Sequence, residues 1–312
     1  MRSARNKTID LTVDEGREYL DRCVTVNAPA ALDAVLDKTI LGDSFAVLPL
    51  LPRESVDLLI VDPPYNLDKA FAPDAGFTRM TDEAYAAYTE RWIALVKPLL
   101  KPDASVYVCC DWQSSPVIGA ALGRHFTVRN RITWQREKGR GAKQNWKNAL
   151  EDIWFATCGR DYTFHVDAVM QRRRVIAPYR ENGAPKDWEE TEEGAFRNTH
   201  PSNFWDDISV PYWSMAENTA HPAQKPEKLL AKLILASSDP GAVVLDPFAG
   251  SGSTAVTAKK LSRHYIGVEQ NAQFCVWAEL RLERAGTDRT IQGYADGVFW
   301  ERNTAAMQKK HR

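Results

Sequence analysis

Residues 242–269 follow a pattern that few folds can accommodate: an apolar run, a turn with Gly250 and Gly252, a helical segment, a second apolar run and then Glu269. The apolar runs predict buried parallel strands, which occur where helices cover both faces of a sheet. The glycines allow close backbone approach, and the N-terminus of the helix favours an anionic group. In dinucleotide folds an acid at the end of the next strand binds ribose hydroxyls. We therefore expect an α/β fold with a nucleotide-binding unit.

The glycine pattern also excludes two common nucleotide sites. A third glycine is missing, which disfavours a nicotinamide dehydrogenase, and no Gly-Lys-Ser/Thr follows, which excludes a Walker A loop. The 312 residues suffice for one large α/β domain and a smaller lobe. The sequence contains neither a membrane-length apolar run nor the apolar core of a signal peptide, so we expect a cytoplasmic protein without a membrane partner. The five cysteines include no CxxC pair, which favours reduced thiols and no metal.

A second motif, Asp62-Pro63-Pro64-Tyr65-Asn66, follows the apolar run 58–61. The run predicts a buried strand, so the motif lies at the carboxyl end, where open α/β sheets place their active sites. Two prolines make a stiff turn whose carbonyls can accept hydrogen bonds. Carboxylate, carbonyl and aromatic ring together suit a planar substrate that carries an amino group. A plain turn with a half-buried tyrosine explains this stretch equally well on its own.

The middle of the chain is more basic and less regular. Residues 131–180 carry eleven Lys and Arg against five Asp and Glu, although the net charge is −1. Residues 135–148 are basic and contain glycines, which predicts a loop that orders on a polyanion. From 162 to about 220 aromatic residues lie among Pro, Asn and Gly, which indicates an irregular lobe with its own recognition surface. Solvated charges and aromatics that pack the lobe are the alternative.

Three motifs taken together resemble those of one known family. DPPYN and Asp246-Pro247-Phe248-Ala249-Gly250-Ser251-Gly252-Ser253-Thr254 resemble the two signature motifs of S-adenosylmethionine-dependent DNA amino-methyltransferases. His221-Pro222-Ala223-Gln224-Lys225-Pro226 resembles the HPTQKP segment of that family, with Ala223 in place of the usual Thr. The catalytic motif comes first and the cofactor motif last, an order similar to that of the β class.

The resemblance implies a Rossmann-like methyltransferase fold with a circularly permuted motif order. We expect a mostly parallel, seven-stranded sheet with helices on both faces and a smaller, irregular target-recognition lobe. The implied divisions are an N-terminal extension (1–35), a catalytic half (36–160), a target-recognition region (161–220), to which the basic loop 135–148 contributes, and a cofactor-binding half (221–312).

The resemblance also implies a reaction: methyl transfer from S-adenosylmethionine, which becomes S-adenosylhomocysteine, to the amino nitrogen of a base flipped out of double-stranded DNA. Asp at the first position of the catalytic motif is typical of adenine-N6 enzymes, so adenine is preferred to cytosine N4. Two competing functions are non-catalytic DNA binding on the same fold and methylation of RNA or of a protein amide. A cognate restriction endonuclease and a homodimer are further partners that the family suggests, in a cytoplasmic, nucleoid-associated protein.

Roles follow residue by residue from the resemblance. Asp62 and the Pro63 carbonyl would accept the amino hydrogens, and Tyr65 would stack on the base. The catalytic set is Asp62, Pro63, Pro64, Tyr65 and Asn66. The cofactor set is Asp43 for the adenine, Lys225 for the methionine carboxylate, Glu269 for the ribose, and Asp246, Phe248, Gly250, Gly252 and Ser253. The DNA set is Trp134, as a wall of the base pocket, with Lys138, Arg140, Lys143, Lys147, Arg172, Arg173 and Arg174. For Trp134, packing in the core is an equally good explanation. No metal is expected.

Overall fold

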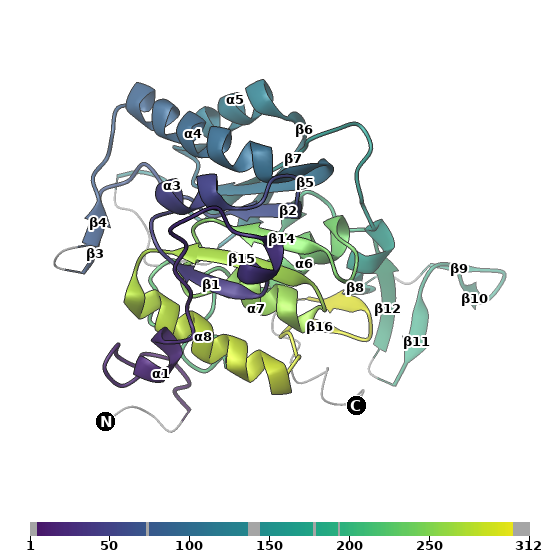
Figure 1. The fold of residues 1–312 in the computed structure, drawn as a ribbon. Helices are drawn as coiled ribbons and strands as arrows, with labels where there is room; N and C mark the ends of the chain where they lie inside the picture. The colour runs from purple at the N-terminus through teal and green to yellow at the C-terminus, as the bar shows by residue number, and fades with distance from the viewer. Residues whose placement is uncertain (1–4, 73–74, 137–143, 177–178, 193, 302–312) are drawn as a thin grey trace.

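The computed structural model describes residues 5–72, 75–136, 144–176, 179–192 and 194–301. Its centre is an eight-stranded sheet in the order β1-β15-β14-β2-β5-β7-β6-β13 (Figure 1). These strands are β1 (Lys38–Leu41), β2 (Val56–Val61), β5 (Leu100–Cys110), β6 (Thr127–Gln135), β7 (Leu150–Thr157), β13 (Phe204–Trp205), β14 (Val243–Asp246) and β15 (His264–Glu269).

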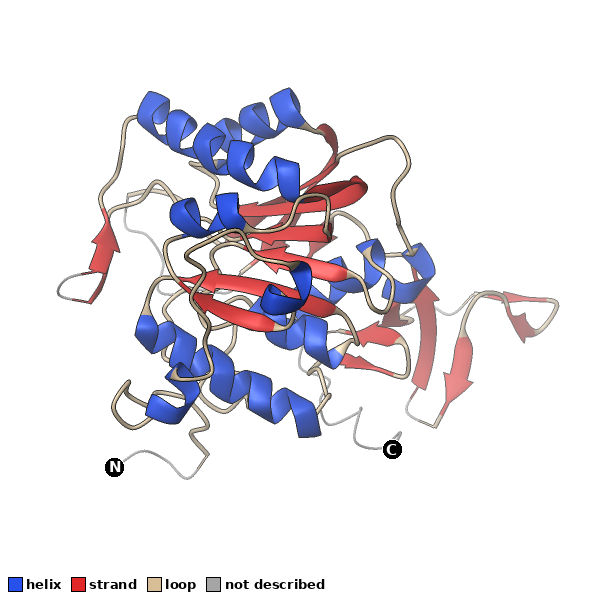
Figure 2. Ribbon diagram, in the orientation of Figure 1, coloured by secondary structure: helices blue, strands red, loops and turns tan. Residues whose placement is uncertain are grey.

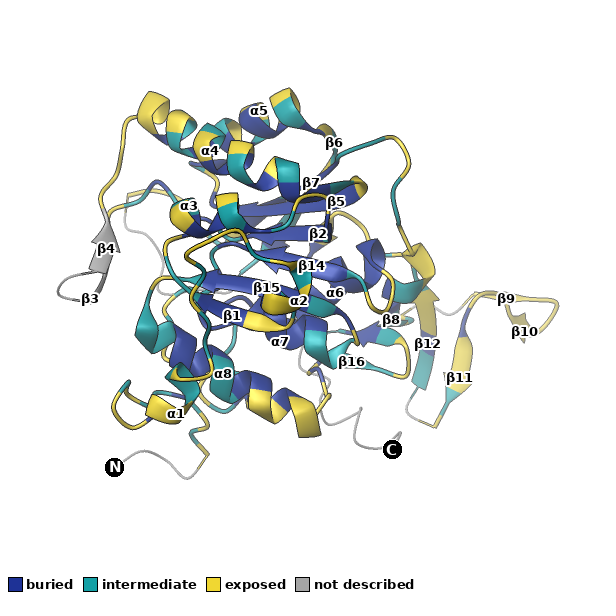
Figure 3. Ribbon diagram, in the orientation of Figure 1, coloured by how far each residue is buried: buried dark blue, intermediate teal, exposed yellow. Residues whose placement is uncertain are grey.

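This sheet confirms the expected fold class. From β1 to β5 all neighbouring strands are parallel, whereas β7 runs antiparallel to β5 and β6. The sheet has one strand more than the seven expected, because the short β13 adds parallel to β6 at the edge. The strands of the centre are buried on both faces, as the apolar runs predict (Figure 3).

Helices cover both faces of the sheet (Figures 1 and 2). On one face lie α3 (Ser44–Val47), α4 (Asp82–Val96) and α5 (Ser115–His125), and on the other α6 (Glu227–Ser237), α7 (Ser253–Lys260) and α8 (Ala272–Thr287). Side chains of β2 alternate between the two cores: Leu59 and Val61 pack with α4 and α5, whereas Leu58 and Ile60 pack with α6 and α7. The neighbouring thiols Cys109 and Cys110 separate in the same way, and all five cysteines are free.

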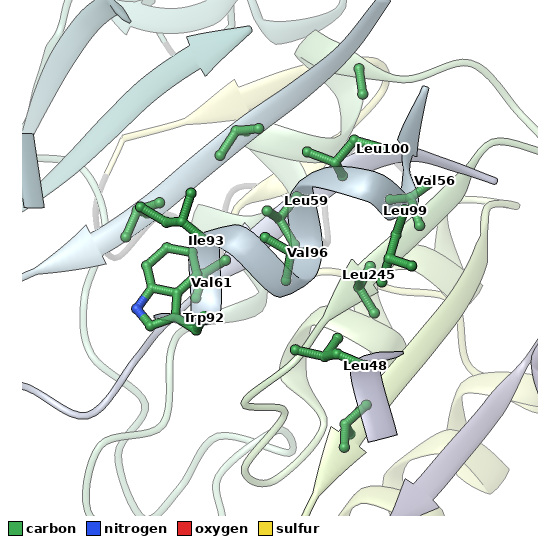
Figure 4. Packing of buried hydrophobic residues seen from close by; sticks show 14 of the residues in the cluster. Leu48, Val56, Leu59, Val61, Trp92, Ile93, Val96, Leu99, Leu100 and Leu245 are labelled. Atoms are coloured by element: carbon green, nitrogen blue, oxygen red, sulfur yellow. The ribbon is translucent and has the colours of Figure 1, made fainter. Parts of the chain in front are cut away.

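Helix α4 shows how the sequence fixes one of these layers. Thr81 caps its first turn by accepting a hydrogen bond from the N–H of Ala84 at 3.2 Å. Trp92, Ile93 and Val96 lie on the face that packs against β2, and all three are fully buried (Figure 4). The helix then tightens into the 3₁₀ turn η2 (Lys97–Leu99), which contains a proline.

A second sheet of five strands, in the order β11-β12-β8-β17-β16, forms the lobe. Its strands are β8 (Gln171–Arg174), β11 (Glu189–Thr191), β12 (Gly194–Thr199), β16 (Tyr294–Ala295) and β17 (Val298–Trp300). The expected boundaries need two corrections. Residues 294–300, assigned to the cofactor half, join the lobe sheet, where β17 pairs with β8 and β16 with β17, and β13, assigned to the lobe, belongs to the main sheet.

The remaining elements are short. They are the helices α1 (Arg17–Leu20) and α2 (Leu32–Val35), the 3₁₀ turns η1 (Leu48–Leu50) and η3 (Val166–Val169), and two hairpins, β3 (Lys69–Ala72) with β4 (Ala75–Phe77) and β9 (Arg180–Glu181) with β10 (Ala184–Pro185). The N-terminal segment packs on the body, because Ile9 is buried against Val276 and Trp277 of α8. No helix within the described ranges is long and apolar enough to cross a membrane.

Candidate active site

Four parallel strands bring their carboxyl ends to one edge of the sheet. β1, β15, β14 and β2 are neighbours, so Asp43, Glu269, Asp246 and Asp62 all arrive at this edge. Ligands of open α/β sheets bind at such an edge. A cavity of about 940 Å³ lies there, a size suited to a cofactor and a substrate. Two motifs that are far apart in the sequence therefore share one site.

Nearly all predicted catalytic and cofactor residues line this cavity: Asp43, Asp62, Pro63, Pro64, Tyr65, Asn66, Lys225, Asp246, Phe248, Gly250, Ser253 and Glu269. Gly252 differs. Its φ is +73°, and a Cβ at this position would stand 2.6 Å from the Cβ of Ala278 in α8. The packing of α8 thus explains why position 252 is a glycine, and the expected cofactor contact of Gly252 stays a prediction.

Backbone N–H groups hold the carboxylates on the cofactor side of the cavity. Asp246 accepts hydrogen bonds from Phe248 N at 3.0 Å and from the Thr254 hydroxyl at 2.6 Å. Glu269 accepts from Gly250 N at 2.8 Å and from Asn271 N at 2.7 Å. Burial raises the pKa of Asp246 to about 7, and it also raises the pKa of Glu269. The bonds of Asp246 span the turn, so this residue shapes the glycine loop.

A buried arginine supports the same loop from α8. Arg281 donates to the carbonyl of Ser251 at 2.7 Å and to the Ser253 hydroxyl at 2.9 Å. Its other terminal nitrogen donates to Glu227 Oε1 at 3.0 Å, and Lys260 pairs with Glu227 Oε2 at 2.7 Å. Sequence reasoning missed this ion pair, because no local pattern shows that Arg281 turns inward from its helix.

On the catalytic side, charged side chains converge on Asp62. The Tyr65 hydroxyl donates to Asp62 Oδ1 at 2.8 Å, and Lys225 Nζ donates to Asp62 Oδ2 at 2.5 Å. Burial, together with the adjacent Asp62 charge, holds the pKa of Tyr65 well above its usual range, so the hydroxyl stays a donor. Lys225 was expected at the methionine carboxylate of the cofactor. The structure instead pairs it with Asp62, and the contact to the cofactor stays a prediction.

Further bonds fix the turn that carries Asp62. The amide of Asn66 forms two hydrogen bonds with the backbone of Met80, at 2.7 and 3.0 Å. The Tyr85 hydroxyl donates to the carbonyl of Pro64 at 3.0 Å. Asn66 therefore supports the turn as expected, because its amide links the turn to the segment before α4.

Arg136 and Glu151 complete the catalytic side, and neither was predicted. Arg136 directly follows β6 and Glu151 is the second residue of β7, two paired strands, and the two side chains form an ion pair with each other. Glu151 is only 3% exposed, and its second oxygen lies 3.4 Å from Lys225 Nζ. Both residues line the cavity. A basic residue at the start of the glycine-containing loop was the only signal in the sequence.

The predicted DNA-contacting residues lie in different environments. Trp134 is fully buried and donates to the carbonyl of Ile208 at 3.0 Å, so it is a core residue and the prediction of a pocket wall was wrong. Arg172 stacks between Phe196 and Trp300 and pairs with Glu189, which makes it part of the lobe packing. Residues that stay accessible are Arg173, Arg174 and Lys147, while Lys138, Arg140 and Lys143 lie outside the described residues.

Comparison with known proteins identifies the family of the chain. Residues 56–279 match the model of the N6/N4 family described as DNA methylase. The chain belongs to this DNA methylase family. The chain is 35% identical over 256 residues to the DNA adenine methyltransferase YhdJ of Escherichia coli K12, covering 80% of this chain and 83% of YhdJ. It is 30% identical to the type II methyltransferase M.HpaI of Haemophilus parainfluenzae, covering 79% and 74% of the two chains.

Solved structures share the fold of this DNA methylase. The complex of M1.HpyAVI with S-adenosylmethionine aligns with a TM-score of 0.53 at 22% identity, over 78% of this chain and 98% of that one. The cytosine-N4-specific PvuII DNA methyltransferase aligns with a TM-score of 0.56 at 18% identity, over 80% and 90%. The Rossmann-like methyltransferase fold expected from the motifs is thus confirmed.

The cavity of the DNA methylase fits its cofactor, S-adenosylmethionine. Gly250 faces the cavity with a φ of +53°, and a Cβ there would stand 3.1 Å from His221 Nε2, so only glycine leaves this wall open. Phe248, Glu269 and Asp43 line the same cavity, and the roles of the two acids toward the ribose and adenine stay predictions. Asp43 also caps α3 through Phe45 N at 3.0 Å. Among the described residues, no group of His, Cys, Asp and Glu could hold a metal ion.

Proposed function

We propose that this DNA methylase methylates N6 of adenine at a defined sequence in double-stranded DNA. The observation that carries the choice of base is the 35% identity to YhdJ, a DNA adenine methyltransferase. The carboxylate, turn and ring of Asp62, Pro63 and Tyr65 suit a planar base that bears an amino group.

The chemistry asked of these residues follows from the weakness of the nucleophile. The lone pair of an exocyclic amine is delocalised into the ring of its base. Asp62 and the Pro63 carbonyl would accept its two hydrogens, which favours a pyramidal nitrogen with a directed lone pair. Bound S-adenosylmethionine supplies an electrophilic methyl group, and the departing thioether is S-adenosylhomocysteine. As the N–C bond forms, the nitrogen gains positive charge, and Asp62 is placed to accept the proton that it must lose.

Stacking on Tyr65 would hold the base once it has left the duplex. Extruding a base costs roughly a few kcal/mol, which stacking and hydrogen bonds inside the cavity must offset. Tyr65 is tied to Asp62 by its hydroxyl, so the ring and the acceptor keep a fixed relation.

Cytosine N4 is the second candidate. The same acceptors fit either amine, and the cytosine-N4-specific PvuII methyltransferase shares this fold. A direct assay separates the two. The protein is incubated with S-adenosylmethionine and unmethylated duplex DNA of varied sequence, and the DNA is digested to nucleosides for mass spectrometry. We expect N6-methyldeoxyadenosine; N4-methyldeoxycytidine would reverse the choice of base.

We assign target recognition to the lobe, residues 161–220 together with 294–300. Its sheet carries the accessible Arg173 and Arg174, and Lys147 lies in the basic loop next to β7. Cations on such a surface bind phosphates and position the duplex. The catalytic and cofactor halves, 36–160 and 221–293, would then bind base and cofactor, and residues 1–35 would brace α8.

The wider setting is part of the proposal. M.HpaI is described as a type II methyltransferase, which supports a cognate restriction endonuclease for this chain. A cytoplasmic, nucleoid-associated location is what the family resemblance implies. A homodimer is expected by family resemblance. Analytical ultracentrifugation tests the dimer, and resistance of the methylated DNA to nucleases encoded beside the gene tests the endonuclease.

A further inference from the structure

Lys225 occupies the position at which Asp62 would receive an amino group. Its side chain is 7% exposed, and its Nζ lies 2.5 Å from Asp62 Oδ2 and 3.1 Å from the Tyr65 hydroxyl. The ammonium is also 5.3 Å from the centre of the Tyr65 ring. It therefore meets the same acceptor and the same aromatic ring that the target amine and its base would use.

A second acceptor lies beside this ammonium. Glu151 Oε2 is 3.4 Å from Lys225 Nζ, yet it is buried and makes no hydrogen bond within the described part of the chain. A buried carboxylate oxygen without a hydrogen bond is costly, so it gains from any donor that comes closer. The other oxygen of Glu151 is already paired with Arg136, which holds the carboxylate in place.

We propose that Lys225 is a positioning residue that exchanges Asp62 for Glu151 when the target amine enters. The inference deepens the proposed function and needs only that the target is an exocyclic amine of DNA. Before entry, the ammonium neutralises Asp62. After entry, the amine takes the hydrogen bond to Asp62 Oδ2 and the ammonium moves to Glu151 Oε2. After the exchange Asp62 keeps the hydrogen bonds of Tyr65 and of the amine, and Glu151 is paired with both Lys225 and Arg136, so every buried charge still has a hydrogen-bonding partner.

The exchange also removes a cation from the reacting atom. A target nitrogen that gains positive charge beside an ammonium would be destabilised, and the effect is strong in a buried site. Glu151 draws the ammonium away at the moment when Asp62 is needed. Glu151 thus acts through Lys225, and Lys225 acts through Asp62.

Three variants test this exchange: Glu151→Gln, Lys225→Met and the double variant. Glu151→Gln keeps the shape of the side chain and removes its charge. Lys101→Met is the matched control, because Lys101 forms a similar pair with Asp57 at 2.6 Å but lies at the start of β5, outside the cavity. The initial rate of transfer of tritiated methyl groups to plasmid DNA, at saturating cofactor and DNA, gives kcat, and equilibrium dialysis without DNA gives the Kd of S-adenosylmethionine.

We expect Glu151→Gln to lower kcat about tenfold or more, the scale of one charged hydrogen bond. The Kd of the cofactor should stay within about twofold in both single variants, which also shows that they are folded. In the Lys225→Met background Glu151→Gln should cause no further loss, since the residue on which it acts is gone. Lys101→Met should match the wild type.

Three results would overturn the exchange. They are an unchanged kcat in Glu151→Gln, equal losses from Glu151→Gln with and without Lys225, and a rise of about tenfold in the cofactor Kd of Lys225→Met, which would assign the ammonium to the methionine carboxylate. If Lys225→Met does not accumulate, Glu151→Gln alone tests the exchange. A lower kcat with an unchanged cofactor Kd supports it, and an unchanged kcat contradicts it. The tritium assay counts transfer to any base, so an error in the choice of adenine does not affect the outcome.

Discussion

The carboxylates on the two sides of the cavity are held mainly by different kinds of donor. On the cofactor side, carboxylates accept hydrogen bonds from backbone N–H groups of the turns beside them. On the catalytic side, Asp62 and Glu151 are held by the side chains of Tyr65, Lys225 and Arg136. Backbone donors cannot leave without unfolding the turn, whereas side chains can exchange partners. This difference supports the proposed exchange: the carboxylates of the cofactor side are fixed by the backbone, whereas those of the catalytic side are held by side chains that can change partners.

Loss of Asp62 should break the catalytic side most completely. We expect Asp62→Ala to lower kcat about 10³-fold or more, because it removes the acceptor for the target amine. The Kd of S-adenosylmethionine should stay near that of the wild type, since the cofactor side keeps its backbone bonds. Exposed Asp103 provides a control, Asp103→Ala, that should be fully active. Equal loss of binding and turnover in Asp62→Ala would mean that Asp62 is structural.

On the cofactor side, Arg281 is the side chain whose loss should cost most. Arg281→Met leaves Glu227 without one partner and Ser251 without its donor, and breaking a buried ion pair costs about 3–5 kcal/mol. Thermal unfolding should show a large fall in Tm, with weaker cofactor binding in the folded fraction. A Tm close to that of the wild type would show that the glycine loop needs no support from α8.

Asp246 makes stability depend on pH. Because burial raises its pKa to about 7 in the folded protein, the folded state binds a proton that the unfolded chain releases at lower pH. The stabilisation is present in acid and is lost as the pH rises from about 4 through about 7. Denaturant unfolding at several pH values should show this slope in the wild type and a weaker one in Asp246→Asn. Identical slopes would place the titration elsewhere, for example at Glu217, whose pKa burial also raises to about 7.

Gly252→Ala and Gly250→Ala sharpen the contrast within the glycine loop. Both have a positive φ, but the new Cβ meets Ala278 at 2.6 Å in the first and His221 at 3.1 Å in the second. We expect Gly252→Ala to lose about 1–3 kcal/mol of stability through overpacking and strain. Gly250→Ala should mainly weaken S-adenosylmethionine binding. Calorimetry measures the stability of the two variants, and equilibrium dialysis measures their affinity for S-adenosylmethionine. Equal losses of stability and of affinity in both variants would contradict this assignment.

The smallest effect is expected outside the cavity. Arg173→Gln with Arg174→Gln should weaken DNA binding only several-fold and lower the salt slope by about one per lost phosphate contact. Arg172→Gln should instead lower stability, because Arg172 packs on Phe196 and Trp300. Fluorescence titrations at several salt concentrations measure the DNA affinities, and thermal unfolding measures the stability. An unchanged salt dependence of DNA binding would show that the DNA-binding surface does not include β8.

Local patterns predicted the parts of the molecule that local sequence determines. The run before Asp62 and the glycine turn after Asp246 each specify a strand and the turn at its end, so the fold class and the location of the site were accessible. For Trp134 the sequence left a pocket wall and core packing equally open, because a strand pattern does not say which element covers each face. The pairing of Glu151 with Lys225 joins residues from β7 and the segment before α6, and only the packed structure brings them together.

The lobe was predicted least well, for a related reason. Its sheet combines residues 171–199 with residues 294–300, and the aromatic and basic composition of one segment cannot reveal a partner strand about a hundred residues away. Arg172 looked like a DNA contact because its neighbours Phe196 and Trp300 were unknown.

The parallel pairing of β17 with β8 limits how this enzyme can be re-engineered or can diverge. A cassette of residues 161–220 moved into a relative would arrive with β8 lacking its neighbour, so a functional chimera should need the C-terminal strand from the same parent. During synthesis the lobe likewise cannot close until β17 has left the ribosome, by which point every strand of the main sheet has already been made. The proposed recognition lobe is therefore the last part of the described structure that the growing chain can complete.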